Sequence, residues 1–168
     1  MVKPAARTAN CSPDPRTLQR LDRQLCFALY SSSLLMTKLY KPVLAPLGLT
    51  YPQYLVMLVL WEADAGHGAG IGVGELGARL YLDSGTLTPL LKRMQAAGLL
   101  ERARSVDDER RVVATLTPAG RALRRRAESV PLQVACATGC NLTELAALTS
   151  RLQALRDNLA GQLEPVGT

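Results

Sequence analysis

The sequence of 168 residues has little of what most metal and cofactor sites require. It contains a single histidine, His67, so its four cysteines (Cys11, Cys26, Cys136 and Cys140) lack the further ligands of a zinc site. Aromatic residues make up only 4%, too few for a platform that stacks single-stranded bases. No glycine-rich motif of a phosphate-binding loop is present. We therefore expect neither a metal centre nor a cofactor.

Long apolar runs are also missing. The longest, from Tyr54 to Trp61, has eight residues, whereas a membrane-spanning helix needs about 20. The first residues lack the apolar segment of a secretory signal. Hydrophobic residues still make up 48%, which excludes wholesale disorder. We expect a cytoplasmic protein without a membrane partner, whose cysteines form no structural disulfide framework.

The apolar periodicity predicts a mainly helical chain with five segments. Residues 1–16 are expected to be a disordered arm, and 17–48 to hold a long helix that ends before Pro42. Residues 49–120 form the middle segment, 121–163 carry the last two helices, and 164–168 are a tail. Thr50 and Gln53 are typical of a helix start, and the following Tyr54–Trp61 run of a buried helix.

The middle segment shows a recognisable order of elements. The glycine-rich residues 65–74 predict a flexible loop, and a short helix follows it. Asp83 or Ser84 can cap a second helix, which Gly98 ends. Residues 99–104 and 112–116 then predict two strands around a polar turn. A helix-turn-helix followed by a hairpin is the pattern of a winged helix-turn-helix.

The last part of the chain is expected to be helical again. Thr117-Pro118 opens a helix that runs to about Val130, and Asn141 with Glu144 caps another. In that final helix, leucines spaced three and four apart predict a seam for a partner helix. Cys136 and Cys140 fall in the connection, where a thiol could reach another thiol or have no role. Cys11 is given no role.

Positive charge gathers on the predicted winged helix. The net charge is +6, and residues 79–126 hold eleven basic and five acidic side chains. Charge runs usually form a solvated surface, but because this cluster coincides with the predicted motif, binding to duplex DNA is favoured. The candidate DNA-binding residues lie on the second helix and at the hairpin tip: Ser84, Thr86, Thr88, Lys92, Arg93, Asp108, Arg110 and Arg111. Arg110 could enter the minor groove with Asp108 orienting it, or the two could form a plain salt bridge.

Cys26 is the candidate reactive thiol. It shares a helix face with Tyr30, and Arg23 could favour its thiolate. Tyr40 and Tyr51 fall near helix ends that could converge on it, and phenols that donate to a thiolate lower its pKa. Spacing alone does not establish that convergence. A cysteine inside a helix is otherwise most often an inert small hydrophobe.

Four segments resemble one known family. They are LDRQLCFALYSSS (21–33), LGLTYPQYLVMLVLWE (47–62), LYLDSGTLTPLLKRMQAAGL (80–99) and DDERRVVATLTPAG (107–120). They are similar to the MarR family of winged-helix repressors, and to its organic hydroperoxide resistance regulators (OhrR type), two-cysteine subgroup. The resemblance implies a homodimer, formed by the first and the last two helices, that binds a near-palindromic operator in double-stranded DNA when reduced.

The resemblance also implies a redox switch. Cys26 would be the peroxidatic cysteine, Tyr40 and Tyr51 would hydrogen-bond its thiolate, and Tyr30 would line the pocket. An organic hydroperoxide, the inducer, would oxidise Cys26 to a sulfenic acid. This would condense with Cys136 of the other subunit, or with Cys140 as the alternative resolver. The disulfide would then separate the recognition helices and release DNA. Phe27 and Met57 would favour organic peroxides over hydrogen peroxide.

Three alternatives stay open at this point. A MarR-type repressor could respond to a small lipophilic or aromatic ligand, with its cysteines incidental. A thiol peroxidase would consume peroxide over many turnovers, but the chain shows no obvious catalytic base, so we expect no enzyme. A DNA-architectural protein would bind without a switch and with a steep salt dependence.

Overall fold

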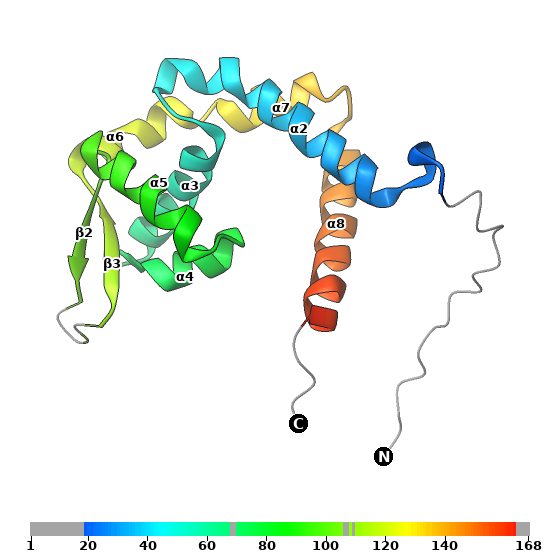
Figure 1. The fold of residues 1–168 in the computed structure, drawn as a ribbon. Helices are drawn as coiled ribbons and strands as arrows, with labels where there is room; N and C mark the ends of the chain where they lie inside the picture. The colour runs from blue at the N-terminus through cyan, green and yellow to red at the C-terminus, as the bar shows by residue number, and fades with distance from the viewer. Residues whose placement is uncertain (1–18, 68–69, 106–107, 109, 164–168) are drawn as a thin grey trace, which may run out of the picture. The chain divides into compact units, whose positions relative to one another are not determined.

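The computed structural model describes residues 19–67, 70–105, 108 and 110–163 (Figure 1). The chain divides into two units, 1–38 and 39–168, and the boundary falls within the first long helix. A 3-10 turn, η1, spans Leu21–Arg23, helix α2 spans Leu25–Leu44, and a second 3-10 turn, η2, spans Ala45–Leu47.

The end of α2 differs from the expectation. Pro42 lies inside the helix, which continues to Leu44, so the predicted stop before Pro42 is wrong. A proline removes one backbone donor and crowds the preceding turn, but here the loss falls in the last turn. The helix also begins later than predicted, at Leu25 instead of residue 17.

Helix α3 spans Tyr51–His67 and begins as predicted. The Gln53 side-chain carbonyl accepts hydrogen bonds from the Thr50 backbone N–H at 2.8 Å and from the Thr50 hydroxyl at 3.1 Å. Tyr54, Leu60 and Trp61 are buried, so the apolar run is a core helix. The capping pair and the run together fix where this helix starts and why it is buried.

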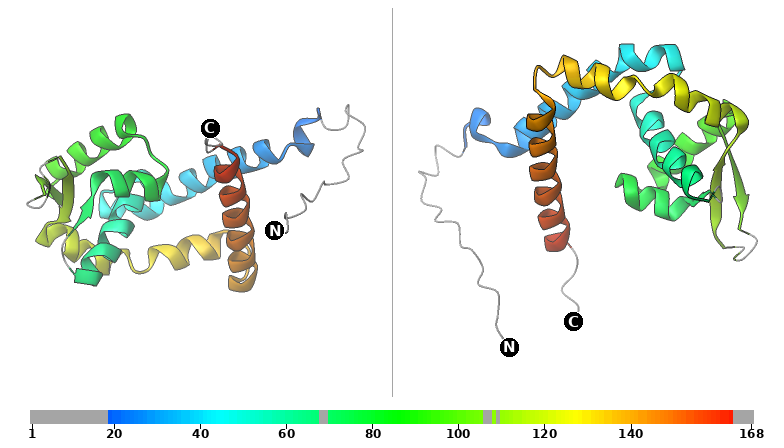
Figure 2. Two further views of the ribbon diagram at one scale, coloured as in Figure 1. Left: turned by 90° about the horizontal axis from the view of Figure 1, so that it is seen from below. Right: turned by 180° about the vertical axis from the view of Figure 1, so that it is seen from behind.

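The winged helix-turn-helix follows. Strand β1 spans Ile71–Gly72, α4 Val73–Leu80, α5 Ser84–Ala96, β2 Leu100–Arg104 and β3 Val112–Leu116. The strands form an antiparallel sheet in the order β1-β3-β2, and the β2–β3 hairpin projects away from the start of α6 (Figures 1 and 2). In the register, Leu100 faces Leu116, and Arg104 faces Val112.

Strand β1 corrects the predicted loop over residues 65–74. Within that stretch α3 continues to His67, and Ile71 pairs with Ala114 of β3. Ile71 is buried, so burial of one apolar side chain and pairing along β3 hold this short segment in place. Residues 68 and 69 of the predicted loop lie outside the described residues.

Three helices complete the chain: α6 spans Pro118–Ala127, α7 Val130–Ala137 and α8 Leu142–Leu163. The helix predicted to run to about Val130 ends at Ala127. A further helix, α7, occupies part of the expected connection, so Cys136 lies in a helix. The start of α8 is as predicted. The Asn141 backbone N–H donates to Glu144, and the Glu144 backbone N–H donates to Asn141, both at 2.9 Å.

The core belongs to the winged-helix part of the chain. Most side chains with essentially no exposed surface come from α3, α4, α5 and β2, including Met57, Leu76, Leu91, Met94 and Leu100, and Leu44 at the end of α2 and Ala114 of β3 join them. The predicted fold class, mainly α with a β-hairpin wing, is confirmed. Among the described residues, no single helix has the length and apolarity to cross a membrane. The bent pair 25–47 and 51–65 meets that test by length and composition only.

Candidate nucleic-acid interface and thiol site

The start of α5 is fixed by Asp83. Its carboxylate accepts hydrogen bonds from the Thr86 backbone N–H at 2.9 Å and from the Thr86 hydroxyl at 2.8 Å. The hydroxyl and then the backbone amide of Thr86 lower the pKa of the Asp83 carboxyl. Gly77 of α4 packs against the backbone of the turn that follows the helix. A Cβ at this position would lie 2.9 Å from the Leu82 carbonyl oxygen, so there is no room for a side chain. The helix-turn-helix is thus held by local geometry at both helices.

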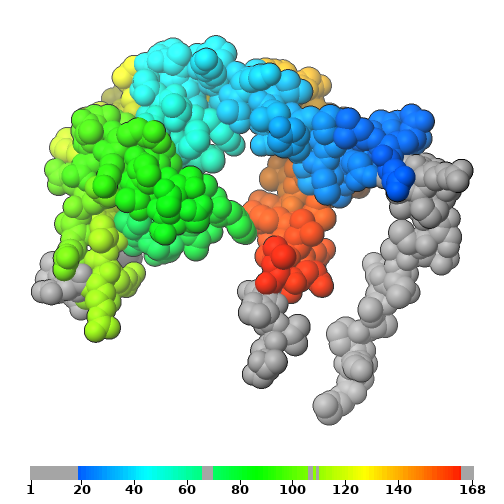
Figure 3. Space-filling view, viewed as in Figure 1, coloured from blue at the N-terminus to red at the C-terminus, as the bar shows by residue number. Residues whose placement is uncertain are grey.

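The predicted DNA-binding residues of α5 lie on one side of the helix, opposite its buried leucines. Ser84, Thr86, Lys92 and Arg93 are exposed, and Thr88 is half-buried. The space-filling view shows α5 on the face beside the wing (Figure 3). Because the Thr86 hydroxyl already donates to Asp83, that residue also holds the helix start. The exposed side of α5 is therefore free to meet a groove.

The tip of the wing is organised by Asp108. Its carboxylate accepts a hydrogen bond from the Arg110 backbone N–H at 3.0 Å, and its carbonyl accepts one from the Arg111 N–H at 2.9 Å. Asp108 therefore orders the backbone of the turn. Arg110 is exposed, and the Arg111 guanidinium lies over Gly72, where a Cβ would be 3.1 Å from it. Residues 106, 107 and 109 of this turn are not described.

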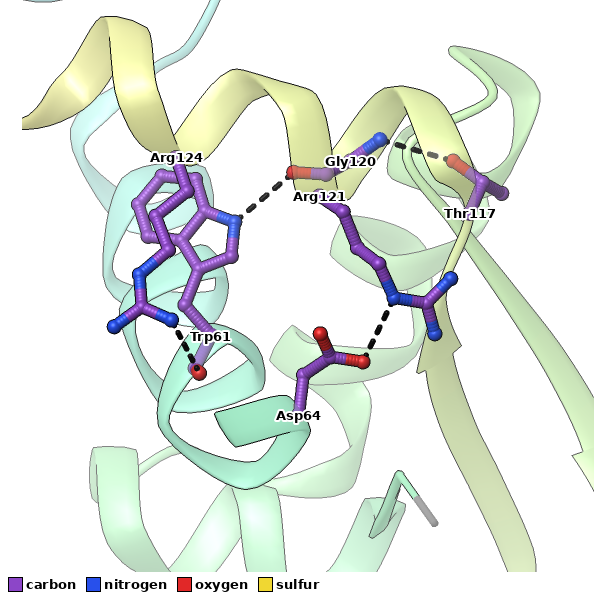
Figure 4. Close-up of polar contacts among 6 residues, drawn as sticks. All are labelled: Trp61, Asp64, Thr117, Gly120, Arg121 and Arg124. Atoms are coloured by element: carbon purple, nitrogen blue, oxygen red, sulfur yellow. Dashed lines mark hydrogen bonds and ion pairs between the residues drawn. The ribbon is translucent and has the colours of Figure 1, made fainter. Parts of the chain in front are cut away.

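A polar junction joins α3 to α6 through residues that the sequence did not mark as functional (Figure 4). The Trp61 indole N–H donates to the buried Gly120 carbonyl at 2.9 Å. An ion pair between Arg121 and Asp64, at 2.8 Å, joins the same two helices. The Arg124 guanidinium donates to the Trp61 carbonyl at 3.5 Å. The only signal in the sequence was a lone tryptophan at the end of a buried apolar run.

The structure brings Tyr40 and Tyr51 together. Their ring centroids are 4.4 Å apart. The ring of Tyr54, which was predicted as part of a buried helix but not as a neighbour of these phenols, lies 5.9 Å from that of Tyr40. Burial raises the pKa of Tyr40 to about 12, with the neighbouring phenols of Tyr51 and Tyr54 adding to the shift. Burial also raises the pKa of Tyr51. Both phenols are therefore protonated at neutral pH and can donate hydrogen bonds.

Cys26 has a free, exposed thiol near the start of α2. Its neighbours Leu25 and Phe27 are exposed apolar residues, and so is the predicted pocket residue Tyr30. The thiol therefore lies outside the core of the single chain. Met57, the other residue expected to favour organic peroxides, is fully buried in α3.

The two candidate resolving cysteines occupy different local structures. Cys136 is in the last turn of α7, and Cys140 follows Gly139, whose φ of +73° lets the chain turn after that helix. The Thr138 hydroxyl accepts a hydrogen bond from the Cys140 backbone N–H at 3.2 Å. Both thiols are free and exposed.

Comparisons with known proteins agree with this architecture. A family model described as transcriptional regulator SarA/Rot matches residues 38–126. The HTH-type transcriptional regulator TtmR of Methylorubrum extorquens is 49% identical over 84% of this chain and 70% of its own length. The organic hydroperoxide resistance transcriptional regulator of Bacillus subtilis is 46% identical over 83% of this chain and 92% of its own length.

Solved structures of one protein, AbfR, show the same fold in two states. Reduced AbfR bound to DNA is 32% identical, covers 88% of this chain and 99% of its own, and gives a TM-score of 0.70. Disulfide-formed AbfR is also 32% identical, covers 89% and 96%, and gives a TM-score of 0.54. The chain therefore belongs to the SarA/Rot–MarR family of winged-helix transcriptional regulators and is of the OhrR type.

Proposed function

We propose that this regulator is a repressor that senses organic hydroperoxides through Cys26. In the proposal, the reduced homodimer binds double-stranded operator DNA, and oxidation of Cys26 releases it. The observation that carries the redox part is a free, exposed thiol at Cys26 in a chain that also pairs the phenols of Tyr40 and Tyr51 at 4.4 Å. The identity of 46% to the organic hydroperoxide regulator of Bacillus subtilis supports the same inducer.

DNA binding is supported by the exposed side of α5 and by the wing. Lys92 and Arg93 are cations on a helix of a size and position suited to a major groove, and Arg110 lies exposed at the hairpin tip. Cations that neutralise phosphates release counterions, so binding to any duplex weakens as salt rises. The DNA-bound AbfR structure, similar over 88% of this chain, supports the same mode of binding.

A homodimer is supported by apolar surface that the single chain leaves open. Leu25, Phe27 and Leu35 are exposed on α2, and Leu148 and Leu152 are exposed on the predicted seam of α8. Exposed apolar stripes of this kind mark surfaces that another protein covers. A second copy of the chain supplies matching stripes, as expected for a two-fold symmetric interface.

In the proposal, the phenols that donate hydrogen bonds to the Cys26 thiolate come from the second copy of the chain. Cys26 and Tyr40 are fourteen positions apart, which corresponds to about 21 Å of helical rise. A phenol of Tyr40 cannot donate to a thiolate at that distance along its own helix. In the proposal, each Cys26 therefore meets Tyr40 and Tyr51 of the other subunit. Because these phenols are protonated at neutral pH, they can stabilise the thiolate.

The proposed chemistry balances without a cofactor. The Cys26 thiolate attacks the terminal oxygen of the hydroperoxide, the O–O bond breaks, and the alcohol leaves after taking up a proton. Cys26 is thereby oxidised to a sulfenic acid. The thiolate of Cys136 of the other subunit then attacks the Cys26 sulfur, a disulfide forms, and the oxygen leaves as water. Cys140 is the alternative resolver, since its thiol is equally free and exposed.

A non-reducing gel with mass mapping tests this chemistry. The reduced full chain receives one equivalent of cumene hydroperoxide, free thiols are blocked, and the disulfide is mapped. We expect a covalent dimer joined through Cys26 and Cys136, and no covalent dimer from Cys26→Ser. A Cys26–Cys140 dimer would reassign the resolver. An unmodified Cys26 would contradict the redox proposal and favour a repressor that responds to a small lipophilic or aromatic ligand.

The matched pair of variants is Cys26→Ser and Cys11→Ser. Cys26→Ser is expected to bind DNA like the reduced wild type and to stay bound after hydroperoxide treatment. In the wild type the same treatment is expected to raise the dissociation constant for DNA by about 100-fold, or ~2.7 kcal/mol. Cys11→Ser is expected to be released normally, because no role is assigned to that thiol. Normal release of Cys26→Ser would contradict the assignment of the peroxidatic cysteine.

A further inference from the structure

A series of aromatic rings runs from the half-buried Tyr40 and Tyr51 into the core. Tyr40 contacts Tyr51 at 4.4 Å between ring centroids and Tyr54 at 5.9 Å. Tyr54 in turn meets Trp61 edge-on at 6.3 Å. Only 2% of Tyr54 and 4% of Trp61 is exposed, so these rings move together with the core around them. The series therefore connects the phenols to the far end of α3.

A series of hydrogen bonds continues from that point. The Trp61 indole N–H donates to the Gly120 carbonyl at 2.9 Å, and the Gly120 N–H donates to the Thr117 hydroxyl oxygen at 3.0 Å (Figure 4). The Thr117 hydroxyl then donates to the Gly98 carbonyl at 2.6 Å. Helix α5 ends at Ala96, and Gly98, with φ of +71°, lies in the turn directly after it and donates its N–H to the Gln95 carbonyl. The contacts thus reach the C-terminal end of the recognition helix.

The junction between α3, α6 and the end of α5 is closely packed. A Cβ at Gly120 would lie 2.1 Å from the Leu99 carbonyl oxygen, so α6 is in direct backbone contact with the residue that follows Gly98. The bond from Trp61 to Gly120 is itself buried, and breaking a buried hydrogen bond leaves an unsatisfied polar group. A shift of Trp61 therefore shifts α6 as well.

We propose that Trp61 and Thr117 are positioning residues that couple Tyr40 and Tyr51 to the recognition helix α5. The inference rests on the proposed function, in which those phenols donate to the Cys26 thiolate. When Cys26 becomes a disulfide sulfur, the phenols lose a charged acceptor and the stack is free to rearrange. Trp61 and Thr117 carry that rearrangement to the end of α5. Neither residue is among the residues assigned to DNA binding.

The test is the ratio of duplex dissociation constants for the oxidised and the reduced protein. Trp61→Phe keeps an aromatic ring but removes the N–H donor, and Thr117→Val keeps the shape but removes the hydroxyl. Both are expected to lower the ratio by about tenfold while Cys26 is oxidised to the same extent. Thr117→Ser retains a hydroxyl and is expected to restore the wild-type ratio within about twofold.

Asp64→Asn is the matched control. It breaks the ion pair with Arg121, which joins α3 to the same helix three residues after Trp61, and is expected to leave the ratio unchanged. A residue with a purely structural role would weaken binding in both redox states and leave the ratio intact. An unchanged ratio in Trp61→Phe and Thr117→Val would therefore overturn this inference but leave the proposed function standing. No release of wild type by oxidation would contradict the proposed function and the inference with it.

A measurement on unmodified protein guards against variants that do not fold. Trp61 is the only tryptophan of the chain, so intrinsic fluorescence at 295 nm excitation reports on this junction directly. Disulfide formation is expected to change the emission maximum and the quenching by acrylamide, and dithiothreitol is expected to reverse both. Identical emission and quenching in the reduced and disulfide states would overturn the inference.

Discussion

Most leucines of the winged-helix lobe (α3 to β3, residues 51–116) are buried, whereas those of the final helix α8 are not. In the lobe, Leu76, Leu91 and Leu100 have no exposed surface or almost none, and α3, α4, α5 and β2 surround them. In α8, no described residue is buried, and Leu148 and Leu163 are 52% and 83% exposed. The lobe therefore has its own core. The leucines of α8 have no such core around them, which is why a homodimer is part of the proposed function.

The largest expected effect tests whether the lobe depends on its own core. Leu91→Ala removes a fully buried side chain and leaves a cavity, so we expect the free energy of unfolding to fall by about 2–5 kcal/mol. Urea denaturation followed by circular dichroism measures it. Gln153→Ala, at an exposed position of α8 off the leucine seam, is the control and is expected to cost less than about 0.5 kcal/mol. An equal loss of unfolding free energy in both variants would contradict the contrast between a buried core in the lobe and an exposed surface on α8.

The second prediction tests the leucine seam of α8. Leu152→Glu places a charge on an apolar surface that a second copy would cover, so we expect the dimer dissociation constant to rise by at least about 30-fold. Sedimentation velocity over a concentration series measures it. Gln153→Glu adds the same charge one position away, off the seam, and is expected to leave the dimer intact. A dimer unaffected by Leu152→Glu would show that another surface forms the interface.

A smaller effect is expected at the wing. Arg110→Ala removes an exposed cation of the hairpin tip, so duplex binding should weaken by about tenfold, or ~1.4 kcal/mol, and the salt dependence should become shallower by about one counterion. Fluorescence anisotropy at several salt concentrations measures both. Oxidation of Cys26 should proceed as in wild type. Unchanged affinity at 150 mM salt would remove the wing from the interface.

The smallest effect concerns the start of α5 and depends on pH. The pKa of Asp83 is lowered by hydrogen bonds from Thr86, so its carboxylate stabilises the folded state above the unfolded pKa of about 4. That contribution is lost as the pH falls below this value. Asp83→Ala should therefore be less stable than wild type at pH 7, and the difference should shrink toward pH 3. Asp83→Asn keeps a capping oxygen without a titrating group, so a difference from wild type that did not vary with pH would contradict the assignment.

Local signals in the sequence predicted most of the helix starts. The capping residues before α3, α5 and α8 act within three or four positions, so Thr50, Asp83 and Asn141 could be interpreted without knowledge of the fold. Winged-helix architecture followed from the order of these elements. The continuation of α2 through Pro42 was missed because tolerance of a proline depends on how near it lies to the helix end.

Contacts between distant segments could not be predicted from the sequence in the same way. Ile71 forms a strand only because it meets Ala114, and nothing in the glycine-rich stretch reveals that partner. Likewise, the hydrogen bond from Trp61 to Gly120 joins residues 59 positions apart. The pairing of Tyr40 with Tyr51 was suggested by their places near helix ends, but the addition of Tyr54 needed the packing of α3.

The most direct test of the account is the affinity of wild type for a duplex selected from a random library by the reduced protein. The dissociation constant is measured before and after one equivalent of cumene hydroperoxide, and again after dithiothreitol, with the disulfide mapped in each sample. We expect a loss of about 100-fold that dithiothreitol reverses. Unchanged affinity in a sample whose Cys26 is fully in the disulfide would contradict it.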